Sequence, residues 1–474
     1  MLTLLILMPF LCALGVFLPV SKDFRLKLFL VVSLCHGLIV ASFWKQLPPG
    51  EYHGFLVLDS LGLIVLSIIS FLFSSVSVFM IGYFKNEPRS NRVFTACLLF
   101  LLSTMSLVAV SYHFGLLWVA IEATTLFSAP LISYHRNQQS LEATWRYLLV
   151  CSVGIALALL GTFFLAIAAH NVHTLLLPAL LKGASSLSTN WMKLSIIFFI
   201  VGYGCKMGLA PTHSWKPEAY GQATGMVAVL MAGALTQCPF LALIRISQIC
   251  NRAGLTEFYS SILIVSGLLS LIVPAMFILG ERNIKRAFAY SSIEHMGILV
   301  LGLGLGTVGL FGALFHMINN ALAKVIMFLT AGSVAQKYGS SGADEVKGVI
   351  HIYPMTGVFL IAALLAGTGV FPFATFHSEL LILNAAIISK HYFLAAIGVI
   401  CLAFMFIGIG RIVLGVIHGH PKEPVLAKKE NIYMNAAIVV TVMLLISIGL
   451  WMPLPLEKLI HNAVTLIGAV YGTV

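Results

Sequence analysis

Two lysines lie inside long apolar stretches of this sequence, where charged side chains are rare. Lys206 belongs to the stretch GYGCKMGLAPTHSWKPEAY (202–220), which follows the apolar run 194–201, and Lys324 lies within LFHMINNALAKVIMFL. A charge in an apolar segment is costly, so such groups usually serve the movement of ions or protons. The two lysines therefore predict proton or ion transfer as the chemistry of this chain.

Two carboxylates have similarly apolar surroundings. Glu122 lies in the middle of HFGLLWVAIEATTLFSAPLI. We expect it within salt-bridge or single-water distance of Lys206, because opposite buried charges partly offset each other's burial cost. The alternative is a neutral carboxyl group that is hydrogen-bonded to a neighbouring helix. Glu379, in GVFPFATFHSELLIL, follows His377 by two residues and is a second candidate for the same path.

A row of polar residues is predicted on one helix face. His316, Asn320 and Lys324 are spaced i, i+4 and i+8, so they share a side of the helix and could line a hydrated proton path. The alternative is a polar stripe that holds two helices together. Glu294 and His295, in AYSSIEHMGIL, lie near a predicted helix end. They could join the path or reach out to the end of the helix.

Glycine and proline interrupt two of the apolar stretches. Gly208 and Pro211 break the first, and His213 follows the break; Gly369 and Pro372 break the second with the same G-x-x-P spacing. Proline removes a backbone donor and crowds the preceding turn. Paired interrupted helices in two halves of a membrane protein indicate inverted repeats around a central ion path. A chance pair of G-x-x-P motifs is the alternative.

The elements that carry these residues are predicted to be membrane-spanning helices. Of the 474 residues, 60% are hydrophobic and 9% charged, and apolar runs alternate with short polar loops. This pattern predicts an all-α polytopic membrane protein with about fourteen spans and almost no soluble domain. The predicted spans are 1–20, 26–44, 55–83, 93–111, 114–134, 145–169, 192–212, 222–248, 257–280, 284–305, 308–336, 354–389, 392–417 and 432–452.

Several classes of function are not supported. The eight cysteines form no C-x-x-C pair, and the sequence has no glycine-rich dinucleotide or phosphate loop. We therefore expect no metal or redox cofactor in this chain. The formal charge of +11 does not indicate nucleic-acid binding, because the basic residues are scattered singly over short loops.

Basic residues also predict the orientation in the membrane. Lysine and arginine are concentrated in the odd-numbered loops, for example in 85–92, 282–286 and 422–429, and Lys216 is counted with them. Positive loops face the cytoplasm. We therefore expect both termini on the outer side, with the first apolar segment kept as a helix because it lacks the features of a cleaved signal peptide.

Five ordered motifs resemble a known family. They are LEATWRYLLVCSVGIALALLGTFF, GYGCKMGLAPTHSWKPEAYGQA, NIKRAFAYSSIEHMGILVLG, LFHMINNALAKVIMFLTAG and GVFPFATFHSELLIL. Over about residues 55–420 the chain is similar to the antiporter-like subunits of respiratory complex I, and most like component F of hydrogenase-4-type and related membrane-bound hydrogenase complexes. The resemblance implies about fourteen helices, with two inverted five-helix repeats and broken seventh and twelfth helices.

The resemblance also implies a route for ions. Glu122 matches the family's span-five glutamate, Lys206 its span-seven lysine, Lys324 the lysine of its H-x-x-x-H-x-x-x-K helix and Glu379 the charged residue of its second broken helix. A proton arriving near Glu122 would change the charge of Lys206, then of Lys324 and then of Glu379.

Three departures from the family pattern fall in the middle of this route. Gln237 stands where a lysine is usual in span eight, and Asn320 stands where the second histidine of span eleven is usual. The usual W-L-P-D-A-H is replaced by W-K-P-E-A-Y, which puts Lys216 in the second position. Because an amide does not take up a proton, we expect the route to depend on water around Gln237 and Asn320.

The expected organisation is an N-terminal group of three helices (1–92), a first repeat (93–250), a second repeat (251–420) and a C-terminal helix and tail (421–474). We expect a proton- or sodium-translocating subunit of a multi-subunit oxidoreductase in a prokaryotic inner membrane. Its partners would be other membrane subunits and peripheral redox subunits, which would carry iron–sulfur clusters and a nickel–iron centre or a flavin. The alternatives are a subunit of a cation/proton antiporter or ion-coupled uptake system without a redox partner, and a structural subunit that does not conduct.

Overall fold

Twenty α-helices and no β-strand build the part of the chain that the computed structural model describes, residues 1–87, 91–418 and 428–468. The prediction of an all-α protein is therefore confirmed. Parts of two basic loops used to predict the orientation, 88–90 and 422–427, lie outside the described residues. The helices are α1 (Leu2–Gly15), α2 (Lys22–Phe43), α3 (Ser60–Tyr83), α4 (Arg92–Val110), α5 (Phe114–Ile132), α6 (Gln138–Ala168), α7 (Leu177–Lys182), α8 (Thr189–Met207), α9 (Trp215–Gln222), α10 (Gly225–Val229), α11 (Gln237–Arg252), α12 (Thr256–Ile278), α13 (Ile284–Gly304), α14 (Gly306–Tyr338), α15 (Val349–Ile352), α16 (Pro354–Gly367), α17 (Ala374–Ile388), α18 (Tyr392–His418), α19 (Ile432–Leu450) and α20 (Leu454–Gly468).

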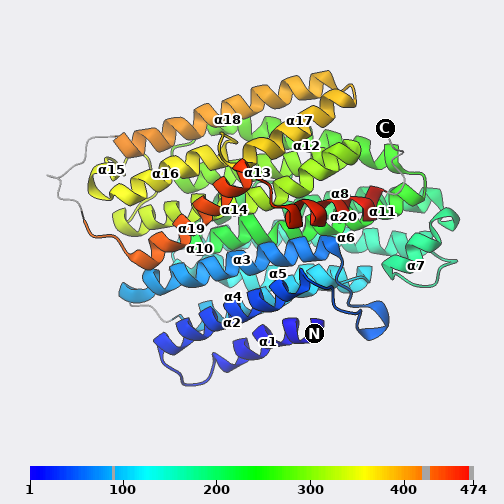
Figure 1. Cartoon of the computed structure of the whole chain (residues 1–474), viewed down its shortest axis with the longest axis horizontal. Coiled ribbons are helices and arrows are strands. Elements are labelled where there is room, and N and C mark those ends of the chain that lie inside the picture. Colours follow the sequence, from blue (N-terminus) through cyan, green and yellow to red (C-terminus); the bar gives the residue numbers. More distant parts are fainter. Residues whose placement is uncertain (88–90, 419–427, 469–474) are drawn as a thin grey trace.

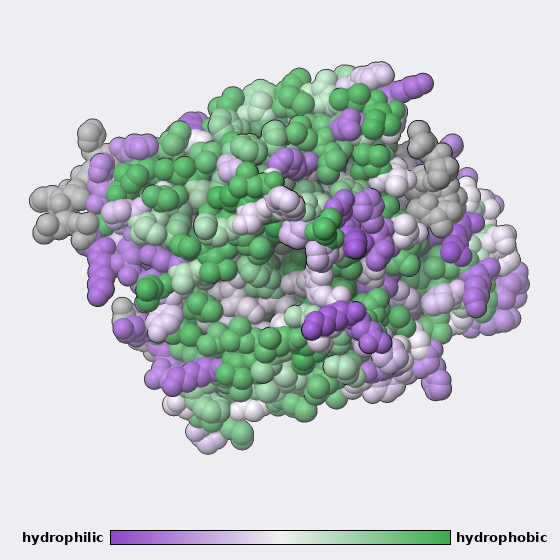
Figure 2. Space-filling view, viewed as in Figure 1, coloured by the Kyte–Doolittle hydropathy of each residue, from purple (hydrophilic) through white to green (hydrophobic). Residues whose placement is uncertain are grey.

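The long helices lie side by side along one direction (Figure 1). Within the described ranges, eleven are long and apolar enough to cross a membrane: α2 to α6, the continuous α10–α11 pair, α12, α13, α14, α18 and α19. The shorter α1 and the interrupted pairs α8–α9 and α16–α17 complete the predicted fourteen passes. In the space-filling view, hydrophobic residues cover most of the middle, and hydrophilic ones gather at the two ends (Figure 2). This distribution is the one that a bilayer requires.

Two of the passes are interrupted, as the sequence predicted. The seventh pass breaks between α8 and α9, and the twelfth breaks between α16 and α17. The twelfth pass comes five passes after the seventh, so the two breaks run in opposite directions. Figure 1 shows the same alternation, because α7, which precedes the first break, lies at the right end, and α15, which precedes the second, lies at the left end. The fold therefore contains two inverted five-helix repeats, while the predicted limits 93–250 and 251–420 stay predictions.

The last pass differs from the prediction. A helix was expected over 432–452, followed by a tail. Instead, α19 ends at Leu450 and α20 continues from Leu454 to Gly468, with Pro453 directly before it and Pro455 in its first turn. The side chains of Gln248 and Asn251 in α11 donate to backbone carbonyls near the end of α20. A fifteen-residue segment interspersed with charged residues was too short and too polar to be recognised as a span.

Helices α11, α13 and α14 form the centre of the bundle and are almost entirely buried. Helix α13 packs on α9, α12 and α14, and α14 packs on α10, α16, α17 and α19. Because these helices meet both interrupted passes, polar side chains on them face one another in the interior of the protein, away from lipid.

Candidate functional site

The first interrupted pass places Lys206 inside the bundle. Helix α8 ends because Gly208 adopts a left-handed conformation (φ 72°), which favours glycine, and the backbone N–H groups of Gly208 and Leu209 return to carbonyls of the last turn. Lys206 lies in that last turn and is fully buried.

Side chains provide hydrogen-bond partners for the backbone N–H and C=O groups that lose their helical partners at this break. The indole of Trp215 donates to the carbonyl of Cys205 at 3.0 Å, and the N–H of Ala210 donates to the hydroxyl of Ser270 at 2.9 Å. Non-helical backbone at membrane depth is tolerated only with such partners. These hydrogen bonds stabilise the break and hold the start of α9 against the C-terminal end of α8.

Lys206 is held by hydroxyl groups. Its ammonium group donates to Thr125 Oγ1 at 2.7 Å and to the hydroxyl of Tyr147 at 2.8 Å. Thr125 donates in turn to Glu122 Oε2 at 3.2 Å. The direct pairing expected between Glu122 and Lys206 is thus replaced by a bridge through the hydroxyl of Thr125. Tyr147 also hydrogen-bonds Ser128 at 2.6 Å, which fixes its orientation.

The second interrupted pass positions Glu379. Gly369 is left-handed (φ 60°), and a Cβ there would overlap the carboxylate of Glu379. The last carbonyls of α16 find donors in neighbouring side chains, Thr375 for Ala366 at 2.9 Å and His295 for Gly367 at 3.1 Å. Because Gly369 has no side chain, the Glu379 carboxylate can occupy the space next to it in the interior.

Lys324, from α14, is also fully buried and is also held by a hydroxyl group. It donates to Ser291 Oγ at 2.9 Å and contacts the sulfur of Met327 at 3.6 Å. Its charge interacts with Glu294 and Glu379. Glu294 and the adjacent His295 are buried in α13, so the alternative that these side chains reach out to the helix end is wrong.

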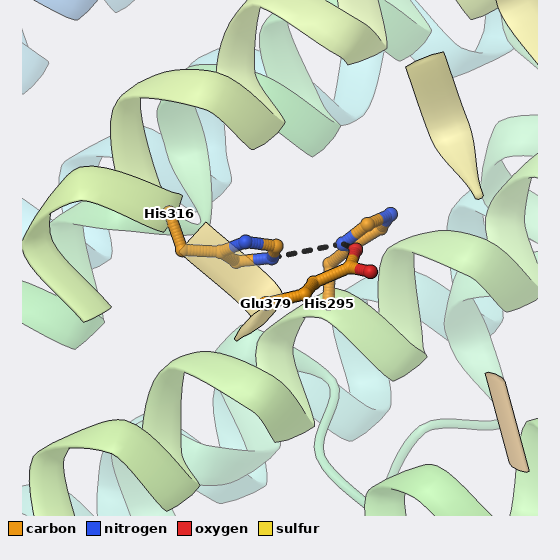
Figure 3. A group of neighbouring side chains, drawn as sticks. All are labelled: His295, His316 and Glu379. Carbon is orange, nitrogen blue, oxygen red and sulfur yellow. Dashed lines mark hydrogen bonds and ion pairs between the residues drawn. The ribbon is translucent and has the colours of Figure 1, made fainter. Parts of the chain in front are cut away.

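Three side chains meet between α13, α14 and α17, and Figure 3 shows them. His295 Nδ1 and His316 Nε2 are 2.9 Å apart, Glu379 Oε1 lies 3.9 Å from His295 Nδ1, and His316 Nδ1 is 2.9 Å from Ser378 Oγ. Because the carbonyl of Gly367 can only accept, His295 Nε2 carries a proton. In neutral His295, Nδ1 then accepts from His316 Nε2, and His316 Nδ1 accepts from the Ser378 hydroxyl. Ser378, His316 and His295 thus form a continuous hydrogen-bonded line, and Glu379 lies beside it with its Oε1 without a hydrogen-bond partner among the described residues.

The same three side chains could hold a metal ion by distance alone. Ligand atoms of His295, His316 and Glu379 lie within 4.8 Å of one another, and two imidazoles with a carboxylate form a common zinc ligand set. The ammonium group of Lys324 interacts electrostatically with all three residues. Since a cation at this range opposes a second cation, we interpret the cluster as a proton relay.

Two buried amides lie on the central helices α11 and α14. Gln237 starts α11 directly after a π-helical turn, Leu230–Leu235, and Asn320 lies in α14 between His316 and Lys324. Neither the nitrogen nor the oxygen of either amide has a protein partner. Buried polar atoms need partners, and ordered water supplies them where protein does not. These amides therefore fit a hydrated region.

Two of the sequence candidates do not join these groups. His213 lies in the turn between α8 and α9 and is half-buried. His377 is also half-buried, and its ring packs against those of Phe371 and Phe376, 6.4 and 5.6 Å away between ring centroids, rather than against Glu379.

Sequence analysis missed the hydroxyl partners of both lysines and one long-range ion pair. Asp59 caps α3 and binds Arg245 of α11 through two hydrogen bonds of 2.5 and 2.7 Å. Burial would raise the pKa of Asp59, but the charge of Arg245 and the hydrogen bonds outweigh it, so that pKa lies below its usual value. The only signal for this pair in the sequence is that each is a charged residue within or next to an apolar segment.

The sequence matches known proteins over most of its length. Residues 111–405 match the family described as NADH:quinone oxidoreductase/Mrp antiporter, transmembrane. A hydrogenase-4 component F homolog from Methylacidiphilum infernorum (isolate V4) is 31% identical over 395 residues, which cover 80% of this chain and 81% of that protein.

Solved structures share the fold over nearly the whole chain. A chain of the membrane-bound sulfane sulfur reductase, an archaeal respiratory membrane complex, superposes with a TM-score of 0.91 at 23% identity, covering 99% of this chain and 98% of that one. A chain of the Mrp complex from Dietzia sp. DQ12-45-1b gives a TM-score of 0.88 at 18% identity, with 99% of both chains covered. At these identities the likeness is one of fold.

Proposed function

Because the chain belongs to the NADH:quinone oxidoreductase/Mrp antiporter family of membrane subunits, we propose that protons are the ions it moves and that they pass along its buried lysines, carboxylates and histidines. The chain is an ion-translocating, multi-pass membrane subunit of a multi-subunit complex related to complex I and the group 4 hydrogenases. Other membrane subunits are its partners. Our proposal is that the transported ion is the proton and that it follows these buried side chains.

The observation that carries the proposal is the way in which the two central lysines are held. Hydroxyl groups contact the ammonium groups of Lys206 and Lys324, at 2.7 and 2.8 Å for the first and 2.9 Å for the second. A hydroxyl both donates and accepts. It can therefore partner a lysine side chain in the protonated and in the neutral form, which a proton carrier must visit in turn.

The chemistry of the side chains favours protons over sodium. Hard metal cations such as sodium prefer oxygen ligands, whereas amines and imidazoles dominate this interior. The two histidines His295 and His316 hydrogen-bond each other directly, an arrangement that passes a proton but does not bind a hard cation.

The end of the bundle that carries α15 has a polar entrance through which, we propose, water reaches the interior. A cavity of about 470 Å³ lies there, lined by polar side chains from several helices and loops, among them Asn137, Gln139, Gln222, Asn283 and Lys285. We propose that this end faces the cytoplasm of a prokaryotic cell and that both termini face outward, which the bias of basic residues supports.

The energy for transport would come from partner subunits. We propose that peripheral redox subunits, carrying iron–sulfur clusters and a nickel–iron centre or a flavin, drive this chain through shifts of charge at its interface. The relationship to a hydrogenase-4 component F homolog supports this assignment. The chain itself would carry protons and no electrons.

The variant Lys206→Met tests the function. The complex, purified by a tag on this chain, is reconstituted into vesicles, and a valinomycin-induced potassium diffusion potential drives proton uptake, which an internal pH dye records. We expect uptake to fall to the level of empty vesicles, because methionine cannot carry a proton. Co-purification of the partner subunits shows that the complex has assembled.

The exposed Lys182, at the end of α7, provides the matched control. Lys182→Met should transport at the wild-type rate. If Lys206→Met assembles and also transports at that rate, the proposal is wrong, and the subunit is structural or conducts elsewhere.

A further inference from the structure

Lys216 is a third fully buried lysine, and its position differs from the one expected from sequence. It was counted with the basic residues of a cytoplasmic loop, but its side chain has no exposed surface. The residue is the second of α9, directly after Trp215, which the carbonyl of Cys205 anchors. The aliphatic part of Lys216 passes over Gly208, where any Cβ would collide with it.

The ammonium group of Lys216 reaches the helix that holds Lys324. Lys216 Nζ donates to the backbone carbonyl of Ser292 at 3.3 Å, and Lys324 Nζ donates to the hydroxyl of Ser291 at 2.9 Å. The two lysines thus engage consecutive residues of α13. Their charges interact, and the charge of Lys216 also reaches His295.

On its other side, Lys216 approaches the first site. The thiol of Cys151, on α6, interacts electrostatically with both Lys206 and Lys216. Cys151 lies one helical turn beyond Tyr147, which holds the ammonium group of Lys206. Lys216 therefore occupies the space between Lys206 and Lys324.

Gln237 occupies the position at which the family pattern has a lysine. Neither the nitrogen nor the oxygen of its amide has a protein partner. An amide does not take up a proton at physiological pH. Lys216 stands where that pattern has a leucine. The chain thus has one lysine fewer at position 237 and one more at position 216, and both positions lie in the stretch between Lys206 and Lys324.

We propose that Lys216 is the proton carrier between Lys206 and Lys324, in place of the lysine that position 237 lacks. This inference rests on the proposed function. In the first step an N–H bond of protonated Lys206 breaks, and water delivers that proton to neutral Lys216. In the second step an N–H bond of protonated Lys216 breaks, water delivers that proton to neutral Lys324, and Lys216 returns to neutrality. Like charges repel, so a proton on Lys216 pushes the preceding proton from Lys324 toward Glu294 and Glu379.

Two variants of Lys216 in the reconstituted complex test the inference. Lys216→Met should lower proton uptake at least tenfold while the partner subunits still co-purify. Lys216→Arg should lose transport as well, because arginine keeps the charge and the donors but does not release its proton. A lysine that served only as a structural cation would be replaced by arginine without loss, so a wild-type rate in Lys216→Arg would overturn the inference.

Gln237→Leu distinguishes the lysine from the amide. If Lys216 carries the proton, transport should depend more on this lysine than on the water held at Gln237, so Gln237→Leu should slow proton uptake less than Lys216→Met does. Loss of transport in Gln237→Leu together with a wild-type rate in Lys216→Met would overturn the inference and place the route in water held by the amide.

Lys206→Met separates this inference from the function on which it rests. If it is inactive while Lys216→Met transports normally, Lys216 is not a carrier and the function stands. If both transport normally, the proposed function itself fails. Should Lys216→Met not assemble, Lys216→Gln keeps a donor for the Ser292 carbonyl and is expected to show the same tenfold loss; a wild-type rate would again overturn the inference.

Discussion

The hydroxyl of Thr125 links a carboxylate to a buried lysine, and Thr125→Val removes this link with little change of shape. The hydroxyl accepts from Lys206 Nζ at 2.7 Å and donates to Glu122 Oε2 at 3.2 Å. Valine has the branched shape of threonine and neither of these contacts. The variant therefore separates the hydrogen-bonded link from the packing around it.

The expected size of the effect follows from the lost hydrogen bond to the ammonium group of Lys206. A hydrogen bond to a charged group contributes about 1.5–3 kcal/mol, and about 1.4 kcal/mol corresponds to a tenfold change in rate. If the link between Glu122 and Lys206 lies on the route, its loss should slow proton uptake by roughly tenfold to a hundredfold. Assembly should be retained, because Lys206 keeps the hydroxyl of Tyr147 at 2.8 Å and its ring at 4.9 Å.

Proton uptake into vesicles under a diffusion potential measures this effect. The matched control is the neighbouring Thr124→Val, because Thr124 is equally buried and its hydroxyl donates only within its own helix, to Ile121 at 2.6 Å. Thr125→Ser, which restores the hydroxyl, should restore transport. An unchanged rate in Thr125→Val, or an equal loss in Thr124→Val, would refute the assignment of this link.

Two further variants test the second break and the long-range ion pair. Gly369→Ala should displace the carboxylate of Glu379 and lower proton uptake, since the added Cβ overlaps that group and the left-handed backbone costs alanine about 1–2 kcal/mol; wild-type uptake would contradict this role of the glycine. Asp59→Asn should destabilise the protein by roughly 3–5 kcal/mol at neutral pH, because Arg245 is left buried and unpaired. The pKa of Asp59 is lowered in the folded protein, so this stabilisation is complete above the unfolded value near 3.8 and is lost as pH falls through the folded value. Melting curves recorded by the fluorescence of the six tryptophans should show the two proteins converging below about pH 4; a constant difference would contradict the pairing.

Most of the fold could be predicted from sequence because a bilayer leaves few alternatives. Apolar runs long enough to span, with proline and glycine at two of them, indicated both the passes and the two interruptions. The segment after Pro453 could not be predicted in the same way. Helix α20 is stable because it packs on α3, α11 and α14, and no local pattern records those contacts.

Some residues of the candidate site could likewise be predicted from the sequence, and others could not. Charged residues in apolar stretches, such as Lys206 and Glu379, stand out in a sequence. Thr125 and Ser291 do not, because hydroxyl side chains are common in membrane helices and bond their own backbone as readily as a partner. Lys216 was misplaced for a different reason. A lysine after a proline break has the pattern of a loop, and only the turn of the chain at Gly208 brings it inside.

The interior contains as many amines as carboxylates along the axis, and this balance limits how the protein can operate. The residues concerned are Lys206, Lys216 and Lys324 on one side and Glu122, Glu294 and Glu379 on the other. A proton that passes from an amine to a carboxylate cancels one positive and one negative charge, so the net charge of the interior is unchanged. Net charge in a low-dielectric region is costly, whereas a rearrangement within a neutral set costs much less. Protons already inside can therefore be redistributed at little cost, but an additional proton is disfavoured until another has left. For the proposed route, electroneutrality therefore predicts an exchanger, in which uptake at one end and release at the other are coupled one to one.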